Sequence, residues 1–339
     1  MLTLSPTRFC AQSNIKAPHL LVVIDTEEEF DWSQPFSRDN TSVRAMRSIA
    51  KVQAIFDSYG IVPTYVIDYP VASQPDGYLP LQELCHDGKA LVGAHLHPWV
   101  NPPFTEMVNG RNSFHGNLPV DLERAKLQTL TDCIQERLGY QPKVFKAGRY
   151  GLGPHTPQLL KEQGYEVDLS VCPYMNYSNE EGPDFSIYSP WPFWIDGGKE
   201  FLELPLTVGY TGYLKAWGNP IHRFIDSGLM KTLHGPGLFS RLGLLNKVWL
   251  SPEGYEIWEQ MELVRTLYHA GLRVFSFAFH SPSVEPGCTP YVRSNAELEQ
   301  FLDKFRKFFD FFFGEMGGVA STPIEIKRHF VNPQELSHG

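Results

Sequence analysis

The chain has 339 residues, of which 42% are hydrophobic, 20% are charged and 13% are aromatic, and its formal net charge is −9. This length and composition are typical of a globular protein with one large α/β domain or two smaller ones. The negative charge and the lack of a Lys/Arg-rich block argue against nucleic acid as a partner, because phosphate binding needs a positive surface.

The five cysteines are scattered along the chain and form no CxxC pair. This argues against a thiolate zinc site or a disulfide framework and indicates a reducing compartment. Residues 1–19 lack the basic and apolar regions of a signal peptide. No apolar run approaches the ~20 residues that a membrane helix needs. We therefore expect a cytoplasmic protein without a transmembrane segment.

Short apolar, β-rich runs alternate with helical patterns, which is typical of βα units around a parallel sheet. The sequence predicts strands at 19–25, 61–67, 90–96, 143–148, 167–171, 201–208 and 273–280. It predicts helices at about 41–58, 120–138, 155–164, 251–270 and 295–316. Seven strands in this order could form an open doubly wound sheet or a barrel, and the pattern alone does not decide between them.

The chain shows no internal repeat and no low-complexity linker, so we expect a single domain over residues 1–339. Ser251, Pro252 and Glu253 match the N-cap, first-turn proline and early acid of the helix predicted at 251–270. Long segments rich in Pro, Gly and aromatic residues are expected to be ordered loops that carry function. They lie at 98–118, 172–200 and 209–250, the last being an insertion with a weakly amphipathic run. That run is either a partner or membrane-surface element or a packed helical lid.

Polar residues recur near the ends of the predicted strands. They are Asp25, His95, His97, Lys146, Arg149, Asp168, Glu203 and His280. In parallel α/β folds, sites are assembled at the C-terminal edge of the sheet. We therefore expect several of these side chains to meet at one site.

The segment GAHLHPW contains the sharpest pattern. In an extended segment, His95 and His97 point to the same side, so both imidazoles can reach one cation. Imidazole together with carboxylate is a normal ligand set for zinc and other transition metals. The acids of IDTEEEFDW end a neighbouring predicted strand. Together the two segments predict a metal site.

The five acids of IDTEEEFDW have different expected roles. Asp25 and Glu27 share a face in extended geometry, whereas Glu28 is turned away. One of the first two is expected to bind the metal and the other to take a proton from an attacking water. Glu28 is expected to cap something local, and Glu29 and Asp31 to begin a solvated turn. The alternative is that all five form a solvated loop.

Three further groups are candidates for the same site. His280 ends an apolar strand and could act as a general acid, because the ordinary pKa of histidine lies near working pH. Arg149 and Asp168 could form an ion pair that positions a catalytic group, or a structural bridge. Glu203 is assigned no role.

These segments, in this order, resemble the polysaccharide deacetylase (NodB homology) family, carbohydrate esterase family 4, over roughly residues 19–320. The closest likeness is to its WalW-type subgroup, which is linked to surface polysaccharide synthesis. IDTEEEFDW corresponds to the family's Asp-Asp pair, and HLHPW to its metal-binding His pair followed by Pro. FKAGRYG corresponds to its Arg-containing turn, and FAFH to its strand ending in His.

The resemblance implies a distorted (β/α)7-type barrel with long active-site loops and one divalent metal ion. Zinc is the first expectation for that ion, with nickel, cobalt and iron as alternatives. It also implies removal of acetyl from an N-acetylated sugar or oligosaccharide.

By the same resemblance, Asp25 is the general base, Glu27, His95 and His97 are the metal ligands, and His280 is the general acid. Arg149 or Lys146 would orient Asp25, with Asp168 holding that cation. The backbone N–H of Tyr150 would help to stabilise the oxyanion.

The sequence departs from the family pattern in two places. The adjacent Asp-Asp is Asp-Thr-Glu here, so the metal carboxylate is either Glu27 or Glu28. The His pair is spaced i, i+2 instead of i, i+4. These changes either leave the ligand set intact with altered geometry or mark a member that has lost activity.

Three other functions compete with this one. The first is an amide hydrolase of the same scaffold acting on small non-sugar amides. The second is a catalytically inactive member that binds glycan or a partner protein. A glycosidase with paired carboxylates fits the paired histidines poorly. Aromatic residues in the loops favour sugar stacking or belong to the core, namely Trp191, Phe193, Trp194, Tyr210, Tyr213 and Trp217.

Overall fold

The computed structural model describes residues 8–10, 12, 15–31, 33–195, 198–215, 218, 220 and 244–332. Much of the predicted insertion at 209–250, including Trp217 and most of its amphipathic run, therefore lies outside the described residues. Within the described ranges, no helix is long and apolar enough to cross a membrane.

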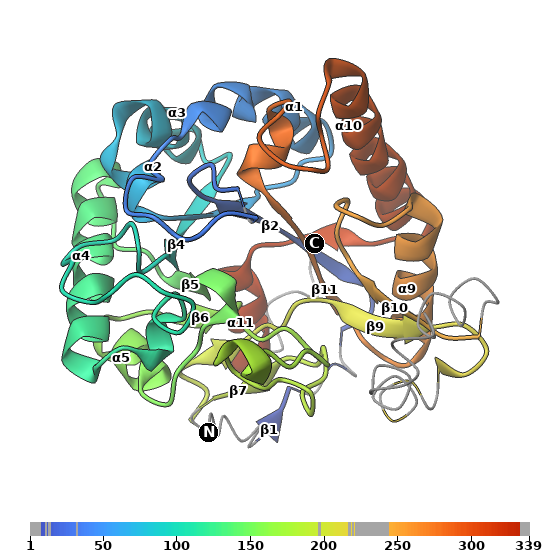
Figure 1. The fold of residues 1–339 in the computed structure, drawn as a ribbon. Helices are drawn as coiled ribbons and strands as arrows, with labels where there is room; N and C mark the ends of the chain where they lie inside the picture. The colour runs from blue at the N-terminus through green and yellow to red at the C-terminus, as the bar shows by residue number, and fades with distance from the viewer. Residues whose placement is uncertain are drawn as a thin grey trace.

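A curled, ten-stranded sheet forms the centre of the fold (Figure 1). The strands are β1 (Arg8–Phe9), β2 (His19–Thr26), β3 (Thr64–Ile67), β4 (Leu91–Leu96), β5 (Val144–Ala147), β6 (Val167–Asp168), β7 (Phe193–Trp194), β8 (Leu202–Glu203), β11 (Val274–His280) and β12 (Val319–Ala320). Their order is β1-β7-β8-β6-β5-β4-β3-β2-β11, with β12 also paired to β2. The stretch from β8 to β11 and β12 is parallel, whereas β7 and β1 are antiparallel additions at one edge. The predicted barrel class is thus confirmed, and the short strands β1, β7 and β12 of this sheet were not predicted.

Helices cover the outer face of this half-barrel (Figure 1). They are α1 (Ile49–Ser58), α2 (Tyr69–Ser73), α3 (Pro75–His86), α4 (Val120–Leu138), α5 (Thr156–Glu162), α9 (Ile257–His269), α10 (Asn295–Phe309) and α11 (Pro323–Val331). Helix α11 is the exception in this list. It packs Ile326 and Phe330 against the apolar cluster on the inner face of the sheet. The helix predicted at 120–138 has these bounds in the structure. The pair α2 and α3 was not predicted, and three prolines lie within residues 69–86.

Strand β2 shows why the site lies where it does. Leu20, Val22 and Ile24 pack outward against the helix layer, whereas Leu21 and Val23 pack into the inner cluster. By the same alternation, the next inward position on β2 is residue 25. The inner column of this strand therefore ends in a carboxylate at the C-terminal edge of the sheet.

The half-barrel is closed between β8 and β11 by segments outside the main sheet. The chain predicted as one strand at 201–208 divides into β8 and β9 (Val208–Thr211), and β9 pairs with β10 (Asn246–Trp249). The N–H of Ser276 in β11 donates to Oγ1 of Thr207 at 2.8 Å. The N–H of Ala278 donates to the carbonyl of Leu250 at 3.1 Å. These bonds hold the opening of the barrel together without continuous strand pairing.

Candidate functional site

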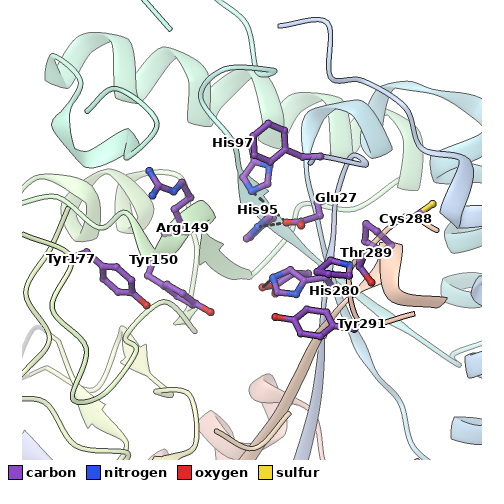
Figure 2. A pocket seen from close by; sticks show the side chains of 15 residues that line it. Glu27, His95, His97, Arg149, Tyr150, Tyr177, His280, Cys288, Thr289 and Tyr291 are labelled. Atoms are coloured by element: carbon purple, nitrogen blue, oxygen red, sulfur yellow. Dashed lines mark ion pairs between the residues drawn. The ribbon is translucent and has the colours of Figure 1, made fainter. Parts of the chain in front are cut away.

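Strand register brings the polar strand ends together. On β2 and β11, Asp25 is the direct partner of His280, and on β4 and β5, His95 is the direct partner of Lys146. Partners in register on parallel strands project to the same side of the sheet. All four side chains therefore reach the same end of the barrel, where Figure 2 shows His95 and His280 among the lining of one pocket.

Three buried groups converge in that pocket. Oε2 of Glu27 lies 3.3 Å from Nε2 of His95 and 3.4 Å from Nε2 of His97 (Figure 2). The three atoms together form a cluster with the spacing of metal ligands. In a tetrahedral zinc site with bonds of about 2.0–2.1 Å, neighbouring ligand atoms are about 3.3–3.4 Å apart. Two histidines and a glutamate also leave one position free, as in catalytic zinc sites.

In each imidazole, the partner of Nδ1 decides whether Nδ1 carries the proton and hence whether Nε2 can bind a cation. Nδ1 of His95 lies 2.9 Å from the carbonyl oxygen of Lys146, which can only accept a hydrogen bond, so Nδ1 carries the proton. Nδ1 of His97 lies 2.7 Å from Oε2 of Glu28. Nε2 of His95 is then a lone-pair acceptor that faces Oε2 of Glu27, and Nε2 of His97 faces the same oxygen and is buried without a hydrogen-bond partner. Such a group of converging acceptors fits a cation, and anchoring through Nδ1 is the usual way to orient metal-binding histidines.

Glu28 supports this cluster from behind. Besides His97, it accepts a hydrogen bond from Nε1 of Trp99 at 2.8 Å. Its backbone N–H donates to Oδ2 of Asp68, whose Oδ1 caps α2 by accepting from the N–H of Val71. Glu28, Asp68 and His97 also have metal-ligand spacing, but their oxygens already accept N–H groups. Burial raises the pKa of Asp68 well above its usual range, and the adjacent Glu28 raises it further.

Asp25 forms a buried ion pair with Lys146. Nζ of Lys146 lies 2.6 Å from both carboxylate oxygens. Burial alone would raise the pKa of Asp25, but Lys146, together with His95 and His280, lowers it below its ordinary value. Asp25 is therefore held as a carboxylate.

His280 is oriented by Glu253, a residue that the sequence did not identify as part of a site. Oε2 of Glu253 lies 2.7 Å from Nδ1 of His280, and its Oε1 accepts the His280 backbone N–H at 3.1 Å. Nε2 of His280 lies 3.7 Å from Oδ2 of Asp25. Burial opposes the charged imidazole, but Glu253, followed by Glu27 and Asp25, raises the pKa of His280 to about 10. The imidazole is thus set up to carry a proton.

The structure decides between the two expected partners of Asp25 and corrects the contact expected for Asp168. Lys146, not Arg149, binds Asp25, because Lys146 lies on β5 whereas Arg149 lies past its end. Arg149 instead donates to Ser113 and Glu180. Asp168 holds neither cation, since no ion pair joins it to either one in the described part of the chain.

Asp168 and Glu203 are buried next to each other on β6 and β8. Asp168 accepts from the hydroxyl of Ser170, which in turn accepts the N–H of Ala147 at 2.7 Å. Burial raises the pKa of Asp168, and the pKa of Glu203 is raised well above its usual range by burial and by Asp168. Through Ser170, Asp168 thus fixes the backbone at the end of β5.

Tyr150 belongs to a backbone turn at the pocket wall. Arg149 and Tyr150 have φ values of 53° and 58°, two successive left-handed non-glycine residues. Each such residue costs on the order of 1–3 kcal/mol and persists where the surroundings enforce it. Gly148 precedes them and packs against His97. The strained turn therefore lies beside the imidazole cluster.

Comparisons with known proteins support the fold. No protein-family model matches the chain, and no curated protein matches it by sequence. Among solved structures, a protein named as a polysaccharide deacetylase from Mycobacterium smegmatis is 15% identical, with a TM-score of 0.51 over 94% of this chain and 92% of that one. The 4-alpha-glucanotransferase from Thermococcus litoralis is 14% identical, with a TM-score of 0.52 over 92% of this chain but only 40% of that one.

At this level of identity the two likenesses show the fold alone. The chain has the fold of a NodB-type deacetylase barrel, as its resemblance to that family implied. The narrower likeness to the WalW-type subgroup stays a prediction.

The pocket itself has a volume of about 350 Å³. Figure 2 shows Arg149, Tyr150 and Tyr177 on one side of it and Tyr291 on the other. Of the loop aromatics expected to stack on sugars or to belong to the core, those that the structure describes do not line this pocket: Phe193, Trp194 and Tyr210 are buried elsewhere, and Tyr213 is exposed. The sequence did not distinguish aromatic residues of the core from those of a sugar-binding pocket, because aromatic side chains are common in both places.

Proposed function

We propose that this protein is a metal-dependent hydrolase that removes acetyl from an N-acetylated sugar or oligosaccharide in polysaccharide metabolism. One observation carries the proposal: the acceptor atoms of Glu27, His95 and His97 converge in a pocket that also contains Asp25 and His280. A ligand set, a carboxylate and a proton-bearing imidazole are the groups that metal-assisted amide hydrolysis needs.

Glu27, His95 and His97 would hold one divalent cation, with zinc favoured by the nitrogen and oxygen donors. When bound, the cation would polarise the amide carbonyl and lower the pKa of an attacking water. The chain's own residues would supply proton transfer and orientation.

Asp25 would take the proton from the attacking water. Lys146 keeps this carboxylate ionised and fixes both of its oxygens, so Asp25 cannot rotate away from the pocket. Lys146 is therefore a positioning residue for the base.

His280 would donate a proton to the nitrogen that leaves as an amine. Glu253 fixes its Nδ1–H, which directs Nε2 toward Asp25 and the pocket. A raised pKa keeps this imidazole protonated until the C–N bond breaks.

The strained turn at Gly148–Tyr150 would place backbone N–H groups at the pocket wall, where the developing oxyanion needs donors. The rings of Tyr150 and Tyr177 stack on each other with centroids 5.6 Å apart. With Tyr291 opposite, these rings offer flat apolar faces of the kind that sugars stack on. Arg149 adds hydrogen-bond donors near the same rim.

The test is acetate release from N-acetylglucosamine and its short oligomers by protein loaded with zinc, nickel, cobalt or iron. Wild-type protein is expected to release acetate, and Asp25→Asn to lose the activity while it still binds metal. Asp39→Asn, on an exposed turn, is the matched control. Metal binding without acetate release from any N-acetylated sugar would contradict the proposal and favour a glycan-binding role or another amide substrate.

A further inference from the structure

A second cavity, of about 300 Å³, adjoins the metal-site pocket. The two share Asp25, Tyr150, His280 and Tyr291, so they meet at the proposed base and acid. The second cavity does not reach Glu27, His95 or His97. It lies in the opening of the barrel between β8 and β11, where Thr207 and Ser276 are part of its lining.

The free surface of this second cavity is mainly apolar. Its walls include Leu206, Leu250, Ala278 and Phe279, with the rings of Trp249, Tyr150, Tyr255 and Tyr291. Several of its polar side chains already have protein partners. Oγ1 of Thr207 accepts the N–H of Ser276, Lys146 binds Asp25, and Glu253 binds His280. The metal-site pocket is different, because Nε2 of His97 has no partner there.

The second cavity is much larger than an acetyl group requires. A methyl group is close in size to a water molecule, whose share of liquid volume is about 30 Å³. A closed apolar cavity of roughly 150 Å³ is enough to hold benzene. At about 300 Å³, this cavity has room for a chain of several carbons or for an aromatic ring.

The position of the cavity determines which part of an amide it would hold. The reacting carbonyl must lie next to the ligand cluster and within reach of both Asp25 and His280, which is the junction of the two cavities. From that point the two substituents of the amide diverge. The hydroxyl-rich amine half needs the polar groups of the first pocket, so the acyl half is directed into the apolar second one.

We propose that the protein accepts N-acyl amino sugars whose acyl group is larger than acetyl, such as butanoyl, hexanoyl or benzoyl, and that the second cavity binds this group. The inference rests on the proposed amide hydrolysis. Water adds to the carbonyl carbon, the C–N bond breaks, and the nitrogen leaves as a protonated amine. The carboxylate product keeps its carbon chain in the second cavity until it dissociates.

The test is a series of glucosamines carrying formyl, acetyl, butanoyl, hexanoyl and benzoyl on nitrogen, with the zinc-loaded wild-type protein. Each buried methylene is expected to raise kcat/KM roughly threefold to fourfold. Hexanoyl should therefore exceed acetyl by at least tenfold. Independently, hexanoate and benzoate should bind the protein more tightly than acetate in calorimetry.

Ala278→Leu fills the second cavity and should bring the ratio of kcat/KM for hexanoyl over acetyl down to about one. The control is Ala270→Leu, at an exposed site after α9, which should keep the wild-type ratio. Release of acetate with a flat or falling chain-length series would overturn this inference and leave the proposed hydrolase standing. If no N-acyl sugar is hydrolysed, the proposed function fails and this inference fails with it.

Discussion

The imidazole of His97 packs directly on the backbone of Gly148. A β-carbon at position 148 would lie 2.3 Å from Cδ2 of His97 and 2.5 Å from the carbonyl oxygen of Leu96. Carbon atoms do not approach this closely, so a side chain at 148 must displace the ring or the strand. The end of β5 and the His-Leu-His segment of β4 therefore fit together only with glycine at this position.

Gly148→Ala is accordingly expected to weaken metal binding strongly and to destabilise the protein by about 1–3 kcal/mol, the usual range for overpacking. Gly314→Ala is the matched control, because a β-carbon there meets nothing within 4 Å. Metal titration and thermal unfolding of both variants measure the effects. Wild-type metal affinity in Gly148→Ala would contradict the described packing of His97.

The two acids of the Glu27–Glu28 pair should respond differently to the same substitution. Glu27→Gln replaces the carboxylate ligand by a neutral amide, which is a much weaker ligand, and should abolish tight metal binding. Glu28→Gln leaves the three ligand atoms in place and loses only the support of Nδ1 of His97, so affinity should fall about 10–100-fold. Equal losses in the two variants, measured by competition with a chelating dye, would argue against this division of roles.

Lys146→Met should leave Asp25 buried without its cation. Because burial raises the pKa of Asp25 and Lys146 lowers it, the substitution should raise that pKa and shift the acid limb of the kcat/KM profile to higher pH. Breaking a buried pair in this way typically costs 3–5 kcal/mol of stability. Lys143→Met, which removes a partly exposed pair with Glu166, serves as the control. An unshifted acid limb in Lys146→Met would show that Asp25 is not the titrating base.

Glu253→Gln should lower the pKa of His280, because Glu253 is the main group that raises it. The alkaline limb of kcat/KM should then move to lower pH. A raised histidine pKa stabilises the fold below its unfolded value near 6.5, and this contribution is lost as pH rises toward about 10. The variant should therefore lose more stability relative to wild type at pH 6 than at pH 10. The opposite trend in chemical denaturation would contradict the pairing.

His19, at the start of β2 and far from the ligand cluster along this strand, should control acid stability. Burial, with the nearby His329, lowers the pKa of His19 to about 4, and Glu325 acts weakly in the other direction. The unfolded chain binds the proton near pH 6.5, so stability should fall as pH drops from 6.5 toward 4. His19→Gln should flatten this part of the profile, while His86→Gln, exposed on α3, should not. Parallel profiles for His19→Gln and wild type would refute the assignment.

The sequence contained enough information for parallel βα units with polar strand ends, because its strands are apolar runs that end in polar residues. The barrel itself followed only from the resemblance to a known family. The spacing of His95 and His97 on one extended segment also places both rings on one side, which is how the structure has them. Both features depend on local geometry alone. Local geometry is what a single sequence encodes most directly.

The contacts that the sequence did not reveal depend on distant segments. Glu253 looked like part of a helix start, but α9 begins at Ile257 with Glu256 as its N-cap, which leaves Glu253 free to bind His280. Lys146 and Arg149 were equal candidates as partners of Asp25, and only the position of Lys146 on β5 separates them. The inward alternation along β5 could have favoured Lys146.

The sequence analysis assigned no helix to the proline-rich region after β3, where the structure has α2 and α3. Pro70 and Pro75 occupy first-turn positions of α2 and α3, where proline is tolerated because its missing N–H has no partner in the helix. Asp68 caps α2 and reaches Glu28 across the sheet. Asp68, to which the sequence assigned no role, thus supports the candidate ligand cluster.

The most direct test of the account is the metal content of the purified protein by mass spectrometry, with wild type beside His97→Ala and the exposed-site control His86→Ala. We expect about one equivalent of zinc, or of nickel, cobalt or iron, in wild type and in His86→Ala, and almost none in His97→Ala. A wild-type protein that stays free of metal after incubation with excess zinc, nickel, cobalt and iron would contradict the account, because the converging acceptors of Glu27, His95 and His97 would then not hold a cation.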